Sequence, residues 1–209
     1  MEKYIDDLIK RYPVLAQCKD SINAAYKLME ESYSSGGKVL IAGNGGSAAD
    51  SEHMAGELMK RFSKSRPISD DFKEKLISID AEIGEELSKN LEGTLRAIPL
   101  VAHEAMSTAY INDVDGYGVF AQQLFGFGDE GDVFIGISTS GNSKNIINAA
   151  IVAKAMGIKV LGLTGQGGGR LAELADVVVR VPEKETYKIQ ELLLPIYHCW
   201  CLMLEDYFF

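Results

Sequence analysis

Short apolar runs alternate along this chain with longer segments in which apolar residues recur every three or four positions. Runs of the buried-strand type occur at 38–43, 97–102, 132–137, 159–164 and 177–181. Strands that alternate with helices at this spacing predict a parallel sheet with helices on both faces. The second run contains Pro99, which predicts an edge strand or a partly broken one.

Three helical segments extend this pattern. The spacing over residues 5–33 predicts one long amphipathic helix that ends at Gly36 and Gly37. This helix either covers the sheet or packs on another copy of itself, and we favour the second. Residues 69–95 are polar on one side and predict one or two inserted helices. Residues 186–209 are apolar nearly all round, so we expect a helix that is buried, partly against another subunit.

The pattern therefore predicts one α/β domain over residues 1–209. We expect a three-layer, doubly wound parallel sheet of five strands, with an N-terminal helical segment at 1–35 and a helical insertion at about 68–95. Ligands of such sheets bind at the carboxyl ends of the strands, so candidate chemistry is sought there.

Composition narrows the class of protein. A chain of 209 residues that is 46% hydrophobic is long enough for one substantial core. Its formal charge of −9 argues against a nucleic-acid or anionic-membrane partner. The sequence opens with no basic-then-apolar leader and contains no apolar run long enough to span a membrane, so we expect a cytoplasmic protein.

Cys18, Cys199 and Cys201 show no metal-site spacing and are expected to be unpaired thiols that fill the core.

A glycine-rich turn follows the first strand. Gly43, Asn44, Gly45, Gly46 and Ser47 lead from an apolar run into a helix, and the free amides at such a helix start suit a phosphate. The turn lacks the Lys-Ser/Thr pair of a Walker loop. Its glycine spacing fits a loose dinucleotide fingerprint, but residues 63–67 do not form the strand that this fingerprint requires. A dinucleotide site and a turn without a ligand remain the alternatives.

Two side chains on the next helix are candidates for chemistry. His53 and Glu57 lie four residues apart, so they project from one face of a helix predicted over 47–62. An imidazole and a carboxylate at this spacing suit a metal ion or acid–base catalysis. The alternative is an ordinary solvated His/Glu pair.

A hydroxyl-rich loop repeats the strand–turn–helix arrangement. Ser138, Thr139, Ser140, Asn142 and Ser143 follow the third strand and precede a helix, forming a neutral, donor-rich cradle for a phosphomonoester. A serine-rich loop without a ligand is the alternative. His103, after the second strand, is either a site residue or a helix cap, and residues 112–118 are expected to form a turn.

As a set, these motifs resemble those of the sugar isomerase (SIS) domain family, of the phosphoheptose isomerase type. The resemblance covers nearly the whole chain and rests on Gly43–Ser47, His53–Arg61, Asn112–Asp113, Gly136–Ser143, Leu163–Gly165, Ile189–Glu191 and His198. It implies an SIS, flavodoxin-like fold. It also implies an enzyme that converts D-sedoheptulose 7-phosphate to D-glycero-D-manno-heptose 7-phosphate, as a homotetramer with active sites between subunits.

The resemblance assigns roles to particular residues. Glu57 and His198 match the catalytic acid–base pair of an enediolate mechanism, and His53, Glu57, Gln190 and His198 match a zinc-binding set. Such a reaction needs a base, an acid and a group that stabilises the enediolate. The residues expected to bind the substrate or its phosphate are Asn44, Gly45, Gly46, Ser47, Arg61, Asn112, Asp113, Ser138, Thr139, Ser140, Asn142, Ser143 and Gln190.

One spacing limits the zinc set. Gln190 and His198 are eight residues apart, which is about 12 Å along a straight helix and too far to share one ion. Either Pro195 distorts the helix or the two residues come from different chains. The chain also departs from the family in the insertion at 68–95, in His103 where an acidic residue is common, and in Tyr187 where Asp is common. These departures concern the sugar portion of the substrate more than the type of reaction.

Two other functions compete with isomerisation. Some relatives associate with the replication initiator and lack the catalytic Glu and His, but this chain keeps both Glu57 and His198. A sugar-phosphate sensor is the other, and the lack of a DNA-binding segment or basic patch weighs against a transcriptional version of it.

Overall fold

A five-stranded parallel sheet forms the centre of the computed structural model, which describes all of residues 1–209. The strands lie in the order β2-β1-β3-β4-β5, and every neighbouring pair is parallel. Their bounds are β1 Val39–Ala42, β2 Ala97–Pro99, β3 Val133–Ile137, β4 Lys159–Thr164 and β5 Val177–Arg180. The predicted fold class is confirmed, and β2 with its Pro99 is an edge strand as expected.

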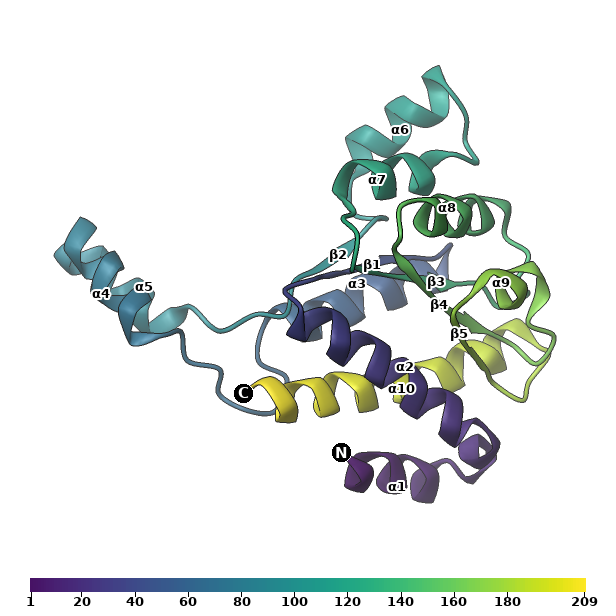
Figure 1. Ribbon diagram of the computed structural model, residues 1–209, viewed down its shortest axis with the longest axis horizontal. Helices are drawn as coiled ribbons and strands as arrows, with labels where there is room; N and C mark the ends of the chain where they lie inside the picture. Colours follow the sequence, from purple (N-terminus) through teal and green to yellow (C-terminus); the bar gives the residue numbers. More distant parts are fainter.

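Helices cover both faces of the sheet, giving three layers (Figure 1). One core joins one face to α1, α2, α3 and α10, and a second core joins the other face to α7, α8 and α9. Successive side chains of a strand point to opposite faces of the sheet and so contribute to different cores. Ile41 and Ile135 belong to the first core, and Leu40 and Phe134 belong to the second. The helices are α1 Glu2–Arg11, the 3₁₀-helix η1 Pro13–Cys18, α2 Lys19–Ser34, α3 Gly46–Met59, α4 Asp70–Ile79, α5 Ala81–Asn90, α6 Glu104–Asp113, α7 Val119–Phe127, α8 Lys144–Ala155, α9 Gly169–Leu174 and α10 Thr186–Phe208.

The N-terminal segment is three helical pieces and not one long helix. Tyr12, with φ −129° and ψ 73°, ends α1, because the residue before Pro13 is disfavoured in the helical region. α2 packs against the sheet of its own chain, where Tyr26 and Met29 are fully buried. This helix therefore covers the sheet of its own chain, which is the alternative that we did not favour.

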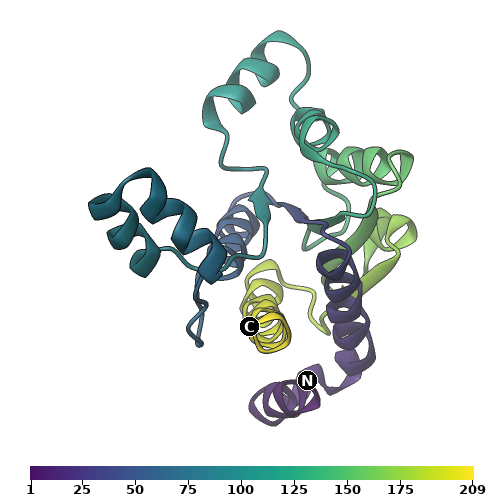
Figure 2. The same cartoon turned by 60° about the vertical axis from the view of Figure 1, so that its left-hand side comes forward.

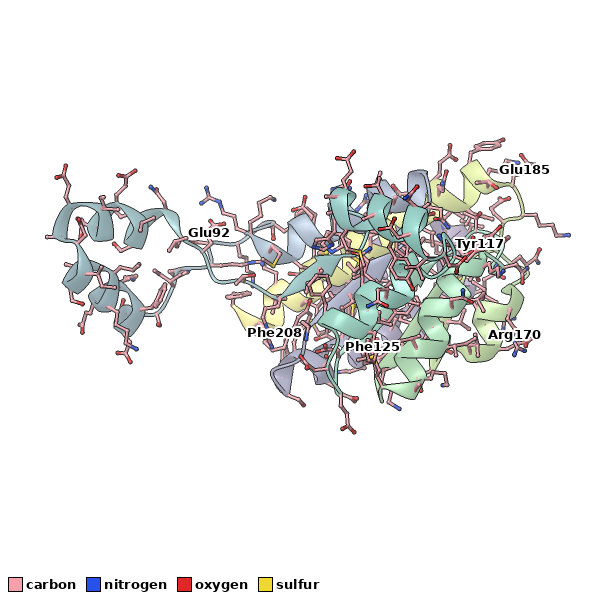
Figure 3. The ribbon with its side chains drawn as sticks, turned by 90° about the horizontal axis from the view of Figure 1, so that it is seen from above. Glu92, Tyr117, Phe125, Arg170, Glu185 and Phe208 are labelled. Carbon is pink, nitrogen blue, oxygen red and sulfur yellow. The ribbon has the colours of Figure 1, made fainter.

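Helices α4 and α5 form a hairpin that projects away from the body of the protein (Figures 1 and 2). Their extensive contacts are with each other, and Gly84 allows the close approach, since a Cβ there would lie 2.3 Å from the carbonyl oxygen of Leu76. Viewed from above, the hairpin extends from a narrow stem at Glu92 (Figure 3). Its apolar side chains remain exposed, with Ile79 at 84% and Ile83 at 56%.

The C-terminal helix α10 runs without interruption through Pro195 and lies against α1, α2 and α3. Cys199, Cys201 and Cys18 are buried and unpaired, as predicted. Asn112 and Asp113 form the last turn of α6, so the turn expected at 112–118 begins only after Asp113. None of the helices combines the length and the hydrophobicity that a membrane-crossing segment requires.

Candidate active site

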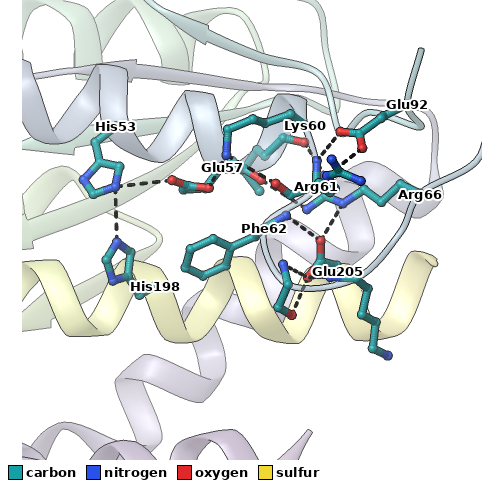
Figure 4. A network of polar contacts seen from close by, with 12 residues as sticks. His53, Glu57, Lys60, Arg61, Phe62, Arg66, Glu92, His198 and Glu205 are labelled. Atoms are coloured by element: carbon teal, nitrogen blue, oxygen red, sulfur yellow. Dashed lines mark hydrogen bonds and ion pairs between the residues drawn. The ribbon is translucent and has the colours of Figure 1, made fainter. Parts of the chain in front are cut away.

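His53, Glu57 and His198 lie together where α3 runs beside α10 (Figure 4). His53 Nε2 is 3.4 Å from Glu57 Oε1 and 3.4 Å from His198 Nε2. The four-residue spacing places the first two on one face of α3, and the packing of the C-terminal helix brings the third to the same point. The fold thus unites three candidate residues that are far apart in sequence.

The surroundings of this cluster favour a neutral His198. Burial, and then the nearby charge of His53, lower the pKa of His198 below its ordinary value. The ring of Phe62 packs on it, with centroids 5.3 Å apart. A neutral imidazole carries one N–H and one lone pair, so it can give or take a proton near neutral pH.

Lys60 fixes one oxygen of the Glu57 carboxylate. Its Nζ lies 2.8 Å from Glu57 Oε2, just after the end of α3 at Met59. The other oxygen, Oε1, therefore faces His53 (Figure 4). Lys60 was not predicted, although its three-residue spacing from Glu57 is a visible signal.

Tyr197 contacts His53 from behind and links it to Asp50. The hydroxyl of Tyr197 lies 3.1 Å from Asp50 Oδ1 and 3.1 Å from His53 Nδ1. Neither residue was predicted. The available signals were the three-residue spacing of Asp50 and His53 on one helix and the position of Tyr197 directly before His198.

The glycine turn lies two helical turns from this cluster. Gly45 has a φ of 59°, which favours glycine, and α3 begins at the next residue. Gly46 faces Gln190 of α10 so closely that a Cβ there would lie 2.5 Å from Gln190 Nε2. Ser47 is buried within the turn, whereas Asn44 is exposed. The structure thus places Gln190 beside the predicted phosphate turn.

Internal hydrogen bonds hold the serine-rich loop in shape. Ser138 Oγ and Ser143 Oγ are 2.9 Å apart, and the backbone N–H of Asn142 donates to Ser140 Oγ at 3.1 Å. Asn142 Oδ1 accepts from the backbone N–H of Arg170 at 3.0 Å, which ties the loop to the start of α9. The flanking elements and these hydrogen bonds therefore fix the position of the loop.

The two loops are joined by a pair of side-chain amides. Asn44 and Asn145 exchange hydrogen bonds of 3.0 and 2.8 Å between the glycine turn and the first turn of α8. Asn145 was not among the predicted residues. A cavity of about 280 Å³, lined by Asn44, Asn145 and Ile111 among others, lies between the glycine turn and α6.

The remaining predicted residues make their contacts elsewhere in this chain. Arg61 Nε lies 3.1 Å from Glu92 Oε1 at the stem of the hairpin, and Asn112 donates to its neighbour Asp113 at 2.7 Å. His103 directly precedes α6, and its Nδ1 lies 2.8 Å from Gln123 Oε1, which gives it a structural partner.

A buried ion pair fixes the segment that follows α3. Arg66 Nε lies 2.8 Å from Glu205 Oε1, with both side chains fully buried. Glu205 also accepts from the backbone N–H groups of Phe62 and Ser63 at 2.8 Å, and Arg66 donates to the carbonyl oxygen of Glu57 at 3.1 Å. This network, which sequence reasoning missed, fixes the end of the helix that carries the candidate carboxylate (Figure 4).

Two side chains of the His53–Glu57–His198 cluster have a separation that fits a metal ion. No group of three or more His, Cys, Asp or Glu side chains in the chain is arranged to hold an ion. Two nitrogen ligands of a tetrahedral zinc, with bonds of about 2.0 Å, lie about 3.3 Å apart. The 3.4 Å between His53 Nε2 and His198 Nε2 matches that separation, so the two histidines fit as a pair. Gln190, two turns away on an uninterrupted α10, does not join them within one chain.

Comparison with known proteins places this chain in the SIS domain family. The SIS domain family model matches residues 3–98 and 90–165. A phosphoheptose isomerase from Aneurinibacillus thermoaerophilus is 41% identical over 86% of this chain and 77% of its own length. Another, from Sulfurimonas denitrificans, is 38% identical over 100% of this chain and 97% of its own length.

Solved structures agree with these relatives. A phosphoheptose isomerase from Francisella tularensis has a TM-score of 0.77 and 29% identity, and the match covers 98% of this chain and 96% of that one. The structure of a phosphoheptose isomerase from Neisseria gonorrhoeae has a TM-score of 0.74 and 30% identity, over 98% and 94% of the two chains.

Proposed function

The chain belongs to the SIS domain family and is a phosphosugar isomerase of the phosphoheptose isomerase type, and from this premise we propose how its residues act. The substrate is sedoheptulose 7-phosphate, and the product is the corresponding heptose 7-phosphate. One observation carries the proposal for the site: Glu57 Oε1 and His198 Nε2 each lie 3.4 Å from His53 Nε2.

The distance between the glycine turn and the His53–Glu57–His198 cluster suits a long sugar phosphate. From Gly46 to His53, α3 rises about 10 Å. The phosphate would lie at the Ser138–Ser143 loop and the glycine turn, which the Asn44–Asn145 pair joins. An extended seven-carbon chain that passes Gln190 then brings C1 and C2 to the acid–base cluster.

Glu57 is the proposed base. Aldose–ketose isomerisation moves a proton from C1 to C2 and a carbonyl from C2 to C1, so atoms and electrons balance without an external oxidant. Lys60 holds Glu57 Oε2, which leaves Oε1 to take the C1 proton and return it to C2.

His198 is the proposed acid for the oxygens. Its lowered pKa keeps the imidazole neutral, with an N–H that can protonate the C2 carbonyl oxygen as the enediol forms. In the second half of the reaction the resulting imidazolate takes the proton from the C1 hydroxyl and becomes a neutral imidazole again. The acid and the base therefore both return to their starting forms.

Zinc is the proposed metal. His53 and His198 would hold it, with Glu57 beside them, and a bound zinc would polarise the substrate carbonyl as a Lewis acid. A Gln190 ligand would have to come from a second copy, because Gln190 lies beside Gly46 in its own chain. We therefore propose a homotetramer with sites between subunits, and the exposed apolar side chains of the α4–α5 hairpin support such an assembly.

The test of this function is an NMR time course with sedoheptulose 7-phosphate, with and without added zinc. Wild-type protein is expected to form the aldose phosphate and to exchange the transferred hydrogen with solvent through Glu57. The Glu57→Gln variant is expected to lose at least about 100-fold of the rate. If wild-type protein leaves this substrate unchanged but converts another ketose phosphate, the heptose assignment fails. If it converts neither, the isomerase function itself is excluded.

A further inference from the structure

The hydroxyl of Tyr197 lies between a carboxylate and an imidazole. It is 3.1 Å from Asp50 Oδ1 and 3.1 Å from His53 Nδ1, and its side chain is fully buried. Asp50 and His53 are both on α3, whereas Tyr197 comes from α10. The contact thus links the two helices directly behind the proposed acid–base cluster.

The chemistry of these three groups fixes the direction of each hydrogen bond. A carboxylate oxygen only accepts, so the hydroxyl proton of Tyr197 goes to Asp50 Oδ1. The other Asp50 oxygen is buried with no hydrogen-bond partner, which makes Tyr197 the donor on which this carboxylate depends. The tyrosine oxygen can then only accept from His53, so Nδ1 of His53 must carry a proton.

This arrangement decides what the opposite nitrogen of His53 presents. With the proton on Nδ1, the neutral ring has its lone pair on Nε2, and that atom faces Glu57 Oε1 and His198 Nε2 at 3.4 Å each. The Tyr197 ring meets the imidazole edge-on, with centroids 5.5 Å apart, which restricts its rotation. Neither Glu57 nor His53 Nε2 then has a proton to give the other, so the space between them suits a cation or a proton in transit.

We propose that Tyr197, held by Asp50, is a positioning residue that keeps His53 in the Nδ1–H tautomer with its Nε2 lone pair directed at the reaction centre. This inference rests on the proposed function, because the reaction centre is the site of that function. The state of the imidazole, however, can be measured without any substrate.

Nitrogen NMR of the full-length protein tests the tautomer directly. The chain has three histidines, so ¹⁵N-histidine labelling gives three sets of ring resonances, which His103→Asn and His198→Asn variants assign. At pH 8 we expect His53 to show a protonated Nδ1 and an unprotonated Nε2. Protonation at Nε2 in wild-type protein, alone or together with Nδ1, would overturn the proposal.

Three variants separate positioning from packing. Tyr197→Phe removes the acceptor, and Asp50→Ala frees the tyrosine proton to donate to His53; both are expected to give a mixture of tautomers. Tyr26→Phe is the matched control, since Tyr26 is also fully buried but lies on α2, and it should leave the His53 resonances unchanged. An unchanged His53 spectrum in Tyr197→Phe would contradict the proposal even if that variant were less stable.

A zinc titration measures the effect of Tyr197 on metal affinity, independently of catalytic turnover. Partners behind a metal-binding histidine typically contribute 10–100-fold in affinity or activity. We expect Tyr197→Phe to weaken Zn²⁺ binding by roughly that factor in competition with a chelating dye, and to lower kcat more than it raises KM. Zinc affinity equal to that of wild type would contradict the positioning role. A protein that shows the Nδ1–H tautomer but no isomerase activity would retain the inference and refute the proposed function.

Discussion

The side-chain amide of Gln190 lies against the backbone of Gly46, so that a methyl group on Gly46 would come within 2.5 Å of Gln190 Nε2. This contact joins the start of α3 to α10 at the phosphate end of the proposed site. A Cβ at position 46 therefore fits only if the Gln190 amide moves.

The first prediction follows from this contact. Gly46→Ala should displace the Gln190 amide, which is the flexible end of a side chain, and so raise KM several-fold while the thermal midpoint changes little. The control is Gly56→Ala on the same helix, where a Cβ meets no atom within 4 Å. That variant should gain up to about 1 kcal/mol of stability and keep its KM. Equal KM values for Gly46→Ala and wild type would show that the displaced amide does not contribute to substrate binding.

The second prediction concerns the serine-rich loop. Ser138 Oγ lies 2.9 Å from Ser143 Oγ, so Ser138→Ala removes one hydroxyl and releases the other from its partner. If the loop binds the phosphate, loss of a hydrogen bond to a charged group should cost about 1.5–3 kcal/mol, or roughly 10–100-fold in KM. Steady-state kinetics and isothermal titration with inorganic phosphate measure this. Ser78→Ala, at an exposed serine of the hairpin, is the control and should behave as wild type.

Periodicity predicted the sheet well because strand and helix patterns are local. The five strands and the edge position of β2 follow from runs of apolar residues and from Pro99. The apolar spacing continues across Pro13, so the pattern predicts one helix where the structure has a break. Asn112 and Asp113 suggested a turn by their composition, yet α6 continues through both because polar residues at a helix end are readily solvated.

The site could be predicted only in part, since contacts between helices depend on their packing. The four-residue spacing of His53 and Glu57 predicts that both lie on one face of a helix. His198 lies near them only because α10 packs beside α3. Resemblance to a family supplied His198, and no pattern in the sequence indicated its distance to His53. Asp50, Tyr197, Asn145 and the Arg66–Glu205 pair were missed for the same reason: each bond joins elements that are distant in sequence.

The third prediction concerns the α4–α5 hairpin. Its helices pack mainly on each other, and the stem is closed by an isolated bridge between Pro67 and Glu92. Replacing residues 69–90 with a short glycine–serine linker should therefore leave the fold and the thermal midpoint of the body nearly unchanged. Because Ile79 and Ile83 are exposed in the single chain, we expect the shortened protein to sediment as a smaller assembly.

Circular dichroism and analytical ultracentrifugation measure these two effects separately. Double substitution of Ile79 and Ile83 by Lys keeps the hairpin length and is the matched variant for the apolar contact. Loss of cooperative unfolding in the shortened protein would show that the hairpin belongs to the core. If both variants form assemblies with the same number of subunits as wild-type protein, the hairpin makes no subunit contact.

The fourth prediction is a loss of stability in acid that depends on Glu205. Burial raises the pKa of this carboxyl, but hydrogen bonds from the Phe62 amide, from Ser63 and from Arg66 outweigh it and lower the pKa to about 2. A folded pKa below the unfolded value, about 4.3, means that the native state binds fewer protons between these two values. The stabilisation is therefore complete above the unfolded pKa and is lost as the pH falls toward 2.

Urea unfolding at a series of pH values between 7 and 2.5 measures this window. Wild-type protein should lose stability steeply below about pH 4.3, and Glu205→Gln should show a shallower dependence there. The same variant should be less stable than wild type at pH 7 by about 3–5 kcal/mol, because it leaves the buried Arg66 guanidinium without its counter-charge. Glu74→Gln, an exposed position on α4, is the control and should keep the wild-type profile. A Glu205→Gln profile parallel to that of wild type would mean that other carboxylates govern the acid transition, and that the Arg66–Glu205 pair is not its source.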